Sequence, residues 1–359
     1  MINFSINGFG RIGRSATRVW LESHTDTLNL TAINTSGSLP ISGWAHLLKY
    51  DTAYGRLPYE ITSEEVSGKG PLIGFLTIQK PNQVYKIPVL AQRDPEKIPW
   101  AEYKAGVVIE STGMFREEEE ARKHLKGGAK LVIISAPAKG ASIPTAVIGV
   151  NEEEIVGEDR VNSYSIISNA SCTTNCVAPV AAVMHGKIGV LKAMLTTVHG
   201  YTDDQKLQDN SHKDMRRARA AALNIIPTTT GAAAATTETI PELKGLFSGL
   251  ALRVPVITGS ITDFTFVTKR TTSVEEVNQI FKDSISSPLY KGVLAVTEEP
   301  LVSSDIIGRP ESAIVDLGLT KVVDGTLVKV MAWYDNEWGY SSRVVDQVKY
   351  VSEKIKEIK

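Results

Sequence analysis

The chain is poor in cysteine, lacks long apolar runs and has no excess charge of either sign, and each absence excludes a class of protein. Cys172 and Cys176 are the only cysteines among its 359 residues. Two thiols so close together on one expected helix form neither a disulfide framework nor a metal-binding set, so we expect a reducing compartment and no metal ion. No apolar run approaches the roughly 18 residues that cross a bilayer, so we expect no membrane-spanning helix.

Positive and negative charges are balanced. Lysine and arginine number 39 against 40 for aspartate and glutamate, which gives a formal net charge of -1. Nucleic acids and anionic membranes bind broad basic surfaces, so we expect neither as the main partner, and any anionic ligand must be bound locally. Residues 1–6 contain no charged leader before an apolar stretch, and we therefore expect a cytoplasmic protein.

The chain is too long for one hydrophobic core, and its pattern changes near residue 172. Before that point, short β-branched runs alternate with polar helical stretches, which is typical of a parallel sheet covered by helices. After it, longer alternating strands predict an antiparallel or mixed sheet. We therefore predict two domains, residues 1–171 completed by a C-terminal helix over 336–359, and residues 172–335.

These periodicities predict individual elements. In the first domain we expect strands at 2–7, 28–33, 107–111 and 131–135, helices at 11–21, 42–50 and 117–126, and hairpins over 56–90. In the second we expect strands at 191–198, 250–256, 261–268, 314–319 and 327–334. A capping box of Ser273 and Glu276 predicts a helix there, and an amphipathic helix is expected over 341–359.

Residues 8–13 read G-F-G-R-I-G and lie between an expected strand and an expected helix. Glycines such as Gly8 and Gly10 allow a tight turn and a close approach of a pyrophosphate to the helix N-terminus. This context favours dinucleotide binding over a plain glycine turn. The predicted fold class is therefore α/β, with a Rossmann-type dinucleotide-binding domain and an α+β catalytic domain whose sheet is mostly antiparallel or mixed.

An acid is missing where such domains usually have one. The second strand ends Ile33-Asn34-Thr35-Ser36-Gly37, and the next acid along the chain is Asp51. A carboxylate at this place would bind the adenosine ribose and repel a 2'-phosphate, whereas hydroxyls such as Thr35 and Ser36 could donate to that phosphate. We predict NADP in preference to NAD, or use of both. In the alternative, Thr35 closes the strand and another group holds the ribose.

Cys172 is placed to act as a nucleophile. It lies in Ser168-Asn-Ala-Ser-Cys-Thr-Thr-Asn-Cys176, where Ser171 is a good N-cap and a helix-compatible stretch follows. At a helix N-terminus the dipole and the free N–H groups favour the thiolate. Cys176, one turn further along, is expected to be a small packing residue.

A cysteine nucleophile needs an imidazole nearby to hold the thiolate and to move protons. The chain has six histidines. His199 is the best placed, because it ends the β-branched run 195–198 and precedes Gly200. A structural histidine is the alternative.

Four cations are concentrated in the eight residues 212–219 of an otherwise neutral chain. Together with the threonines and glycine of 228–231 and with Arg253, they offer guanidinium forks, hydroxyls and flexible backbone suited to phosphate. The alternative is a solvated helix face paired with nearby acids.

Taken together, these residues resemble the glyceraldehyde-3-phosphate dehydrogenase family over essentially the whole chain. The resemblance is carried by 6–14 (INGFGRIGR), 168–176 (SNASCTTNC), 212–219, 227–232 and 333–340 (WYDNEWGY). It implies that Cys172 attacks an aldehyde, that His199 acts as base, and that hydride passes to the nicotinamide of NAD(P). Inorganic phosphate then cleaves the thioester to an acyl phosphate.

The resemblance also implies roles for other residues. The C3 phosphate of the substrate would be held by Thr202 and Arg253, and the attacking phosphate by Ser171, Thr173, Arg217, Thr230 and Gly231. The cofactor would be bound by Gly8, Gly10, Arg11, Ile12, Asn34, Thr35, Ser36, Arg93, Thr112, Ser135, Ser211 and Asn336. The family further implies a homotetramer in which the loop 201–223 reaches a neighbour's cofactor.

Two positions depart from the pattern of NAD-using members, which typically carry Asp in place of Thr35 and Pro in place of Ser211. Both departures favour NADP, which would suit reduction of the acyl phosphate. The hairpin region 67–88 is also longer than usual. Erythrose-4-phosphate dehydrogenase, which releases an acid by hydrolysis, is the nearest alternative activity, and a nucleotide-independent thiol hydrolase and a nucleic-acid-binding protein are more distant ones.

Overall fold

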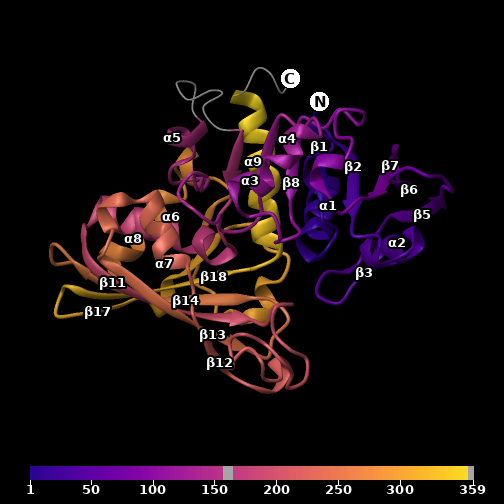
Figure 1. Cartoon of the computed structure of the whole chain (residues 1–359). Helices are drawn as coiled ribbons and strands as arrows, with labels where there is room; N and C mark the ends of the chain where they lie inside the picture. Colours follow the sequence, from indigo (N-terminus) through magenta and orange to yellow (C-terminus); the bar gives the residue numbers. More distant parts are fainter. Residues whose placement is uncertain (157–164, 355–359) are drawn as a thin grey trace. The chain divides into compact units, whose positions relative to one another are not determined.

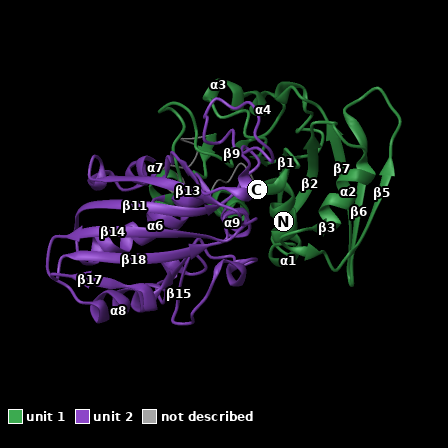
Figure 2. Cartoon of the chain, turned by 90° about the horizontal axis from the view of Figure 1, so that it is seen from below, with its two compact units in different colours: residues 1–146, 152–170, 344–359 green, residues 147–151, 171–343 purple. Residues whose placement is uncertain are grey.

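The computed structural model describes residues 1–156 and 165–354, which include most of the chain. The chain divides into two compact units (Figure 2). Unit 1 comprises residues 1–146, 152–170 and 344–359, and unit 2 comprises 147–151 and 171–343. The part of the predicted last helix beyond residue 354 lies outside the described residues.

Unit 1 is built on an eight-stranded sheet with the strand order β10-β9-β8-β1-β2-β7-β6-β5. The strands are β1 (Ile2–Asn7), β2 (Leu28–Thr35), β5 (Glu60–Glu65), β6 (Leu72–Lys80), β7 (Gln83–Ala91), β8 (Val107–Glu110), β9 (Leu131–Ile134) and β10 (Ile166–Ser168). The strands from β10 to β7 pair in parallel, whereas β5, β6 and β7 pair antiparallel. The predicted hairpins therefore extend the parallel sheet at its β2 side. A separate short ribbon consists of β3 (Tyr50–Asp51) and β4 (Gly55–Arg56).

The helices predicted over 11–21 and 42–50 form, whereas the one predicted over 117–126 does not, and the short helix Glu152–Val156 was not predicted. The helices of unit 1 are α1 (Arg11–Ser23), α2 (Ile41–Lys49), α3 (Glu118–Ala121), α4 (Lys123–Lys126), α5 (Glu152–Val156) and the 3-10 turn η1 (Pro95–Lys97). The single helix predicted over 117–126 is wrong, because the chain forms two short pieces that meet at Arg122. There the N–H of Leu125 bonds to the carbonyl of Arg122 only three residues back, which tightens the turn.

Unit 2 is built on a mixed sheet in the order β12-β13-β11-β14-β18-β16-β15, with β17 also paired to β18. The strands are β11 (Val190–Gly200), β12 (Ile226–Thr228), β13 (Phe247–Val254), β14 (Ser260–Thr268), β15 (Leu294–Thr297), β16 (Ala313–Asp316), β17 (Lys321–Val323) and β18 (Leu327–Tyr334). Pairs β11–β13 and β15–β16 are parallel and the others antiparallel. This confirms the predicted fold class.

The helices α6 (Cys172–Lys187), α7 (Ala232–Thr239) and α8 (Val274–Ser284) lie on one side of this sheet (Figure 1). They cover a core that includes Phe264, Phe281 and Val330. The last helix is α9 (Trp338–Lys354), which begins in unit 2 and belongs to unit 1 from residue 344 onward. The short turns of unit 2 are η3 (Ala221–Leu223), η4 (Pro241–Leu243), η5 (Pro288–Tyr290), η6 (Ser303–Ile306) and η7 (Leu317–Leu319).

Only half of the predicted capping box forms at the start of α8. Ser273 accepts a bond from the N–H of Glu276, as expected. The Glu276 carboxylate, however, binds Arg270 and Thr272 instead of the N-cap backbone.

Within residues 1–156 and 165–354, no helix combines the length and apolar character needed to cross a membrane. The same part of the chain holds no group of three or more His, Cys, Asp or Glu side chains arranged for a metal ion.

Candidate active site

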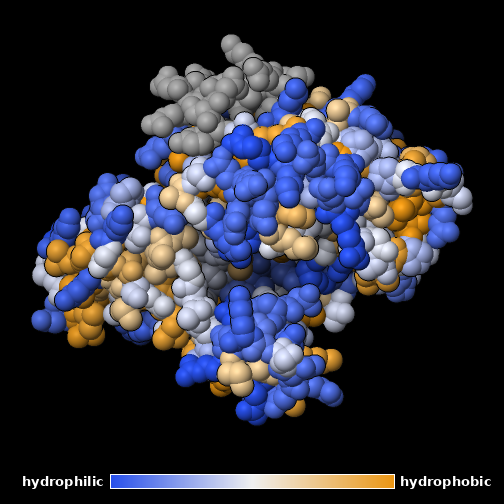
Figure 3. Space-filling model, viewed as in Figure 1, coloured by the Kyte–Doolittle hydropathy of each residue, from blue (hydrophilic) through white to orange (hydrophobic). Residues whose placement is uncertain are grey.

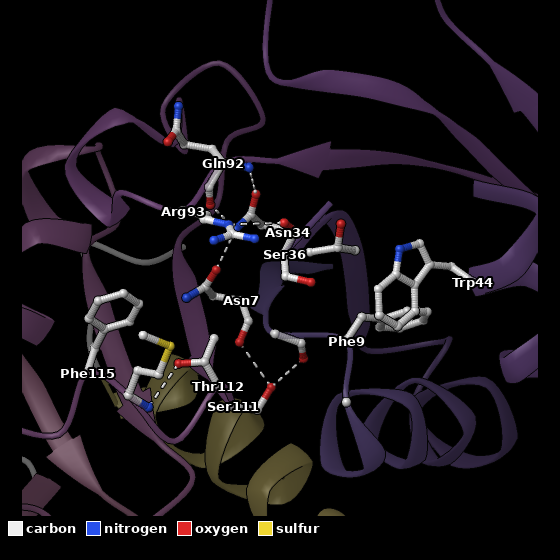
Figure 4. Close-up of a pocket in the computed structure, with 14 residues that line it drawn as sticks. Asn7, Phe9, Asn34, Ser36, Trp44, Gln92, Arg93, Ser111, Thr112 and Phe115 are labelled. Carbon is white, nitrogen blue, oxygen red and sulfur yellow. Dashed lines mark hydrogen bonds between the residues drawn. The ribbon is translucent and has the colours of Figure 1, made fainter. Parts of the chain in front are cut away.

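Unit 1 contains a cavity of about 360 Å³ at the carboxyl ends of β1, β2 and β8, which we call the unit 1 pocket (Figure 4). Ligands of open α/β sheets bind at this edge, and the volume is within the range of small-molecule sites. The pocket is lined by Asn7, Gly8, Phe9, Gly10, Asn34, Thr35, Ser36, Trp44, Gln92, Arg93, Ser111, Thr112, Met114 and Phe115.

The glycine loop forms one wall of this pocket. Gly8 has φ +97°, and a Cβ on it would lie 2.7 Å from the backbone nitrogen of Thr112. A Cβ on Gly13 would lie 2.1 Å from the carbonyl oxygen of Gly8. Helix α1 can therefore pack this close to the glycine loop only because residue 13 has no side chain. A Cβ on Gly10 would meet nothing within 4 Å. The backbone at Gly10 thus has open space beside it, as the close approach of a pyrophosphate requires.

Seven of the predicted cofactor residues line the unit 1 pocket, namely Gly8, Gly10, Asn34, Thr35, Ser36, Arg93 and Thr112. Five others do not. Arg11 points its guanidinium to Asp51 at 2.5 Å. Ile12 lies in the first turn of α1, and Ser135 follows β9 with its N–H bonded to the carbonyl of Glu110. Ser211 and Asn336 belong to unit 2.

A buried polar network centred on Glu110 borders the pocket and was not predicted from the sequence. Glu110 is 1% exposed, and its carboxylate accepts bonds from Asn7 Nδ2, His124 Nε2 and both the N–H and the hydroxyl of Thr112. Trp100 Nε1 donates to His124 Nδ1 at 3.0 Å, so the other ring nitrogen carries the proton that Glu110 accepts.

This network orients the pocket amides. Asn7 receives a bond from Asn34 Nδ2 at 2.7 Å, and Asn34 also bonds the backbone of Gln92 (Figure 4). Since Asn7 donates to Glu110, the buried carboxylate determines which way both amides point. The sequence does contain a signal for this buried acid, because Glu110 directly follows the apolar run Val107-Val-Ile of the predicted strand.

The pocket edge that lacks an acid is formed by the end of β2. Thr35 is buried, and its hydroxyl donates to the carbonyl of Leu90 at 3.0 Å. A single hydroxyl has one proton to donate, so in this structure the Thr35 hydroxyl donates to Leu90 and not into the pocket. Ser36 is exposed, and Arg93 Nε lies 3.5 Å from its carbonyl oxygen. None of the lining residues is acidic, and Arg93 is the basic one.

In unit 2 the thiol lies at the start of α6, as predicted. Ser171 is the N-cap and accepts a bond from the N–H of Thr174, and Cys172 is the first helical residue. The preceding Ala170 has φ 56°, a left-handed conformation that is uncommon for alanine. Such strain is often found at functional sites, where the surrounding structure maintains it.

Cys172 and His199 are brought together. Cys172 Sγ lies 3.4 Å from His199 Nε2. On the far side of the ring, Nδ1 lies 2.6 Å from the carbonyl oxygen of Gly200 and 2.8 Å from Arg253 Nη1. Gly200 only accepts and Arg253 only donates, so one tautomer cannot serve both. We assign the proton to Nδ1 on the shorter contact, which leaves Nε2 free to accept the proton of the thiol.

The pKa shift of the Cys172 thiol runs opposite to the one expected from the helix dipole. Burial raises the pKa of the Cys172 thiol, and the positive charge of Arg253 and bonds from Thr173 oppose that rise. Burial, together with the positive charge of Arg253, lowers the pKa of His199 to about 3. The imidazole is therefore neutral near pH 7 and can act as a proton acceptor.

Cys176 is a packing residue, as predicted. It is fully buried in the unit 2 core, and burial raises the pKa of its thiol. Beside it, the hydroxyl of Tyr334 bonds Thr173 Oγ1 at 3.0 Å and Thr197 Oγ1 at 2.8 Å.

The residues predicted to bind phosphate lie at the start of α6, on β13 and on loops of unit 2. Arg253 Nη1 lies 3.4 Å from Thr202 Oγ1. Thr230 accepts a bond from the N–H of Ala232 at the start of α7, where Gly231 is the N-cap.

Arg217 lies beside an acid that the sequence analysis did not single out. It binds Asp204 through Nη1 and the carbonyl of Thr229 through Nη2. The segment 212–219 contains turns and no helix, so this part of the alternative is wrong. Its other part, pairing with nearby acids, is present, because Arg217 also pairs with Asp214 at 3.3 Å and Arg219 pairs with Asp209 at 2.8 Å.

Comparison with known proteins agrees with this geometry. The family described as glyceraldehyde 3-phosphate dehydrogenase, NAD binding domain, matches residues 2–118, and its C-terminal domain matches residues 171–336. The chain belongs to the glyceraldehyde-3-phosphate dehydrogenase family. All residues that line the unit 1 pocket lie within the first match, and Cys172, His199 and Arg253 lie within the second.

Relatives are similar over nearly their full length. Glyceraldehyde-3-phosphate dehydrogenase 2 of Streptomyces arenae is 49% identical over 345 residues, which cover 96% of this chain and 97% of the relative. The glyceraldehyde-3-phosphate dehydrogenases of Streptomyces coelicolor and Mycobacterium avium are 48% and 46% identical over 358 residues, 99% of each chain. Membership of this family confirms the NAD-binding fold and the oxidoreductase class that were predicted from the sequence.

Proposed function

We propose that this protein catalyses the reversible, phosphorylating oxidation of glyceraldehyde 3-phosphate to 1,3-bisphosphoglycerate with NAD(P). The observation that carries the proposal is the Cys172–His199 pair at 3.4 Å, within the part of the chain that matches the family's C-terminal domain. A thiol nucleophile with an adjacent neutral base suits covalent capture of an aldehyde.

In the first step Cys172 Sγ forms a bond to the aldehyde carbon while His199 Nε2 accepts the thiol proton. The imidazolium that results can return a proton to the oxygen of the thiohemiacetal. Because its Nδ1–H is held by the carbonyl of Gly200, the ring keeps the orientation that both transfers need.

After oxidation the substrate remains bound to Cys172 as a thioester. A phosphate oxygen then attacks the carbonyl carbon, the C–S bond breaks, and the sulfur leaves as a thiolate. A thioester is suited to this exchange because its carbonyl stays more reactive than that of an oxygen ester. The nicotinamide, when bound, supplies the hydride acceptor that side chains lack.

Two groups of unit 2 residues are proposed to hold the phosphates. Thr202 and Arg253 would bind the C3 phosphate of the substrate, since Arg253 Nη1 lies near both the threonine hydroxyl and His199. The inorganic phosphate would be bound by Ser171, Thr173, Arg217, Thr230 and Gly231.

The dinucleotide is proposed to bind in the unit 1 pocket, whose open glycine backbone fits a pyrophosphate. Residues 1–171 with the C-terminal helix 336–359 would form the cofactor domain, and residues 172–335 the catalytic domain. Asn336 is proposed to bind the carboxamide: its Oδ1 accepts a bond from Ser260 Oγ at 2.7 Å, which orients its Nδ2 as the donor.

NADP is proposed as the preferred cofactor, or as one used alongside NAD. The pocket edge beside Ser36 has the cationic Arg93 and no carboxylate, which favours a 2'-phosphate electrostatically. Both cysteines are free, which suits the reducing environment of the cytoplasm, where we propose that the protein acts.

Self-association, as a homotetramer, is proposed from the unit 2 sheet. Large apolar side chains on its strands and nearby loops are exposed, and apolar surface is visible over β11 and β17 at the left of Figure 3. They include Leu191, Met194, Leu246, Leu250, Val323 and Leu327. Apolar surface of this kind marks protein interfaces. Light scattering of the wild type and of Met194→Glu tests this, and a wild-type mass of one chain would contradict it.

Phosphate dependence tests the reaction. Turnover of glyceraldehyde 3-phosphate should require inorganic phosphate or arsenate, because the thioester must be cleaved by an anion. A phosphate-independent rate with erythrose 4-phosphate would support the alternative dehydrogenase and overturn this proposal.

A further inference from the structure

Asp204 lies between residues that the proposed function assigns to the two phosphates. Thr202 Oγ1 donates to its Oδ1, and Arg217 Nη1 donates to its Oδ2. In the substrate-free protein, one carboxylate therefore accepts a bond from a residue proposed to bind the C3 phosphate and from a residue proposed to bind inorganic phosphate.

The contacts continue from Asp204 toward the thiol. Thr202 Oγ1 donates to Asp204 and lies 3.4 Å from Arg253 Nη1, which can donate to it. Arg253 in turn lies 2.8 Å from the ring of His199. These contacts form a row of five side chains in the order Arg217, Asp204, Thr202, Arg253 and His199. All five residues belong to unit 2, so the row lies within one compact body.

Asp204 is a charged group in this row. Burial raises the pKa of its carboxyl, but the hydrogen bond from Thr202 and the charges of Arg217 and Arg253 outweigh burial and lower the pKa below its usual value. The carboxylate is thus ionised near pH 7. Its side chain is 47% exposed, whereas that of Arg217 is 14% exposed, so the acid is the more solvated partner of this pair.

We propose that Asp204 is a built-in counter-ion, which binds Thr202 and Arg217 in place of a phosphate and gives up these bonds when a phosphoryl group arrives. The inference rests on the proposed function. Thr202 has one hydroxyl proton, so it cannot donate to Asp204 and to a phosphate oxygen at the same time. A doubly charged phosphate competes with the carboxylate better than a singly charged ion such as chloride, so Asp204 would also make the site selective for phosphoryl groups.

The chain provides a matched control. Asp203 is the adjacent residue, is exposed, and forms no hydrogen bond or ion pair with any part of the chain that the structure describes. Asp203→Asn and Asp204→Asn remove the same charge one residue apart, but only the second removes the carboxylate that contacts Thr202 and Arg217.

The experiment measures KM for inorganic phosphate at saturating glyceraldehyde 3-phosphate and dinucleotide, and the sulfate concentration that half-protects Cys172 from alkylation. For Asp204→Asn we expect both values to fall about fivefold, since one negative charge a few ångströms from a dianion is removed in a partly solvated site. Asp203→Asn should stay within about a factor of two of the wild type.

An unchanged or higher KM and protection constant in Asp204→Asn would overturn the inference, as would an equal shift in Asp203→Asn. A melting temperature checks that each variant is folded. The two hypotheses fail differently: if the wild type shows no phosphate-dependent turnover, the proposed function is wrong, whereas phosphate-dependent turnover with no effect of Asp204→Asn refutes only the counter-ion.

Discussion

Replacing Arg93 by glutamine should reduce the preference of the protein for NADP over NAD. Arg93 is exposed, lines the unit 1 pocket and has its Nε 3.5 Å from the carbonyl oxygen of Ser36. It is the basic residue among the fourteen that line the pocket, and none of them is acidic. The substitution removes the charge and keeps a polar, though shorter, side chain.

The magnitude follows from the exposure of this group. Two unit charges about 4 Å apart in water attract by about 1 kcal/mol, and a 2'-phosphate carries up to two charges. Salt screening and the lost freedom of an exposed arginine reduce the net effect to roughly 1 kcal/mol, or about fivefold in affinity. NAD has no charge at this position, so its binding should change little.

The assay compares kcat/KM for NADP and for NAD in the wild type, in Arg93→Gln and in Lys130→Gln. Lys130 is an exposed lysine of unit 1 outside the pocket, so its variant controls for net charge. The NADP/NAD ratio should fall about fivefold in Arg93→Gln at low salt, and less at high salt. An unchanged ratio, or equal losses for both cofactors, would refute the assignment of Arg93 to the 2'-phosphate.

Three other predictions concern catalysis, cofactor choice and stability. Cys172→Ser should abolish dehydrogenase activity and retain dinucleotide binding. His199→Asn should slow turnover by about 10²–10⁴-fold and raise the pH at which Cys172 is alkylated, and normal alkylation in this variant would exclude His199 as the base. Thr35→Asp with Ser211→Pro should raise the relative kcat/KM for NAD, and unaltered discrimination between the cofactors would contradict this. Tyr334→Phe should lower the free energy of unfolding by about 1–3 kcal/mol, since two buried threonine hydroxyls lose a partner, whereas Tyr50→Phe, at an exposed position, should have little effect in the same urea titration.

Much of the fold was predictable because its signals are local. The alternation of β1 and β14 and the apolar run of β8 are visible within a few residues, and Ser171 caps α6 through a backbone group three residues away. The predictions failed where a local rule had a competitor. Glu276 forms no complete capping box because its carboxylate binds Arg270 and Thr272 and not the backbone of the N-cap.

The candidate site was predictable to a smaller extent. The Cys172–His199 pairing was inferred from residue type, and the two side chains lie 3.4 Å apart in the structure. The direction of their pKa shifts could not be inferred, because burial and the charge of Arg253 depend on the folded chain. Arg11, which was expected at the cofactor, binds Asp51 in this structure. No property of the pattern around Arg11 predicts that partner, which is supplied by the β3–β4 ribbon.

The sequence by itself determined the two kinds of sheet, the glycine loop, the thiol at a helix N-terminus and the family, because each is encoded in short stretches of residue type and spacing. Only the tertiary structure decided which polar groups meet. Glu110 binds Asn7, which lies 103 positions away, and Arg253 lies against His199 from a neighbouring strand. Hydrogen bonds and charges act over a few ångströms in space, so their partners depend on how distant segments pack and not on their order in the chain.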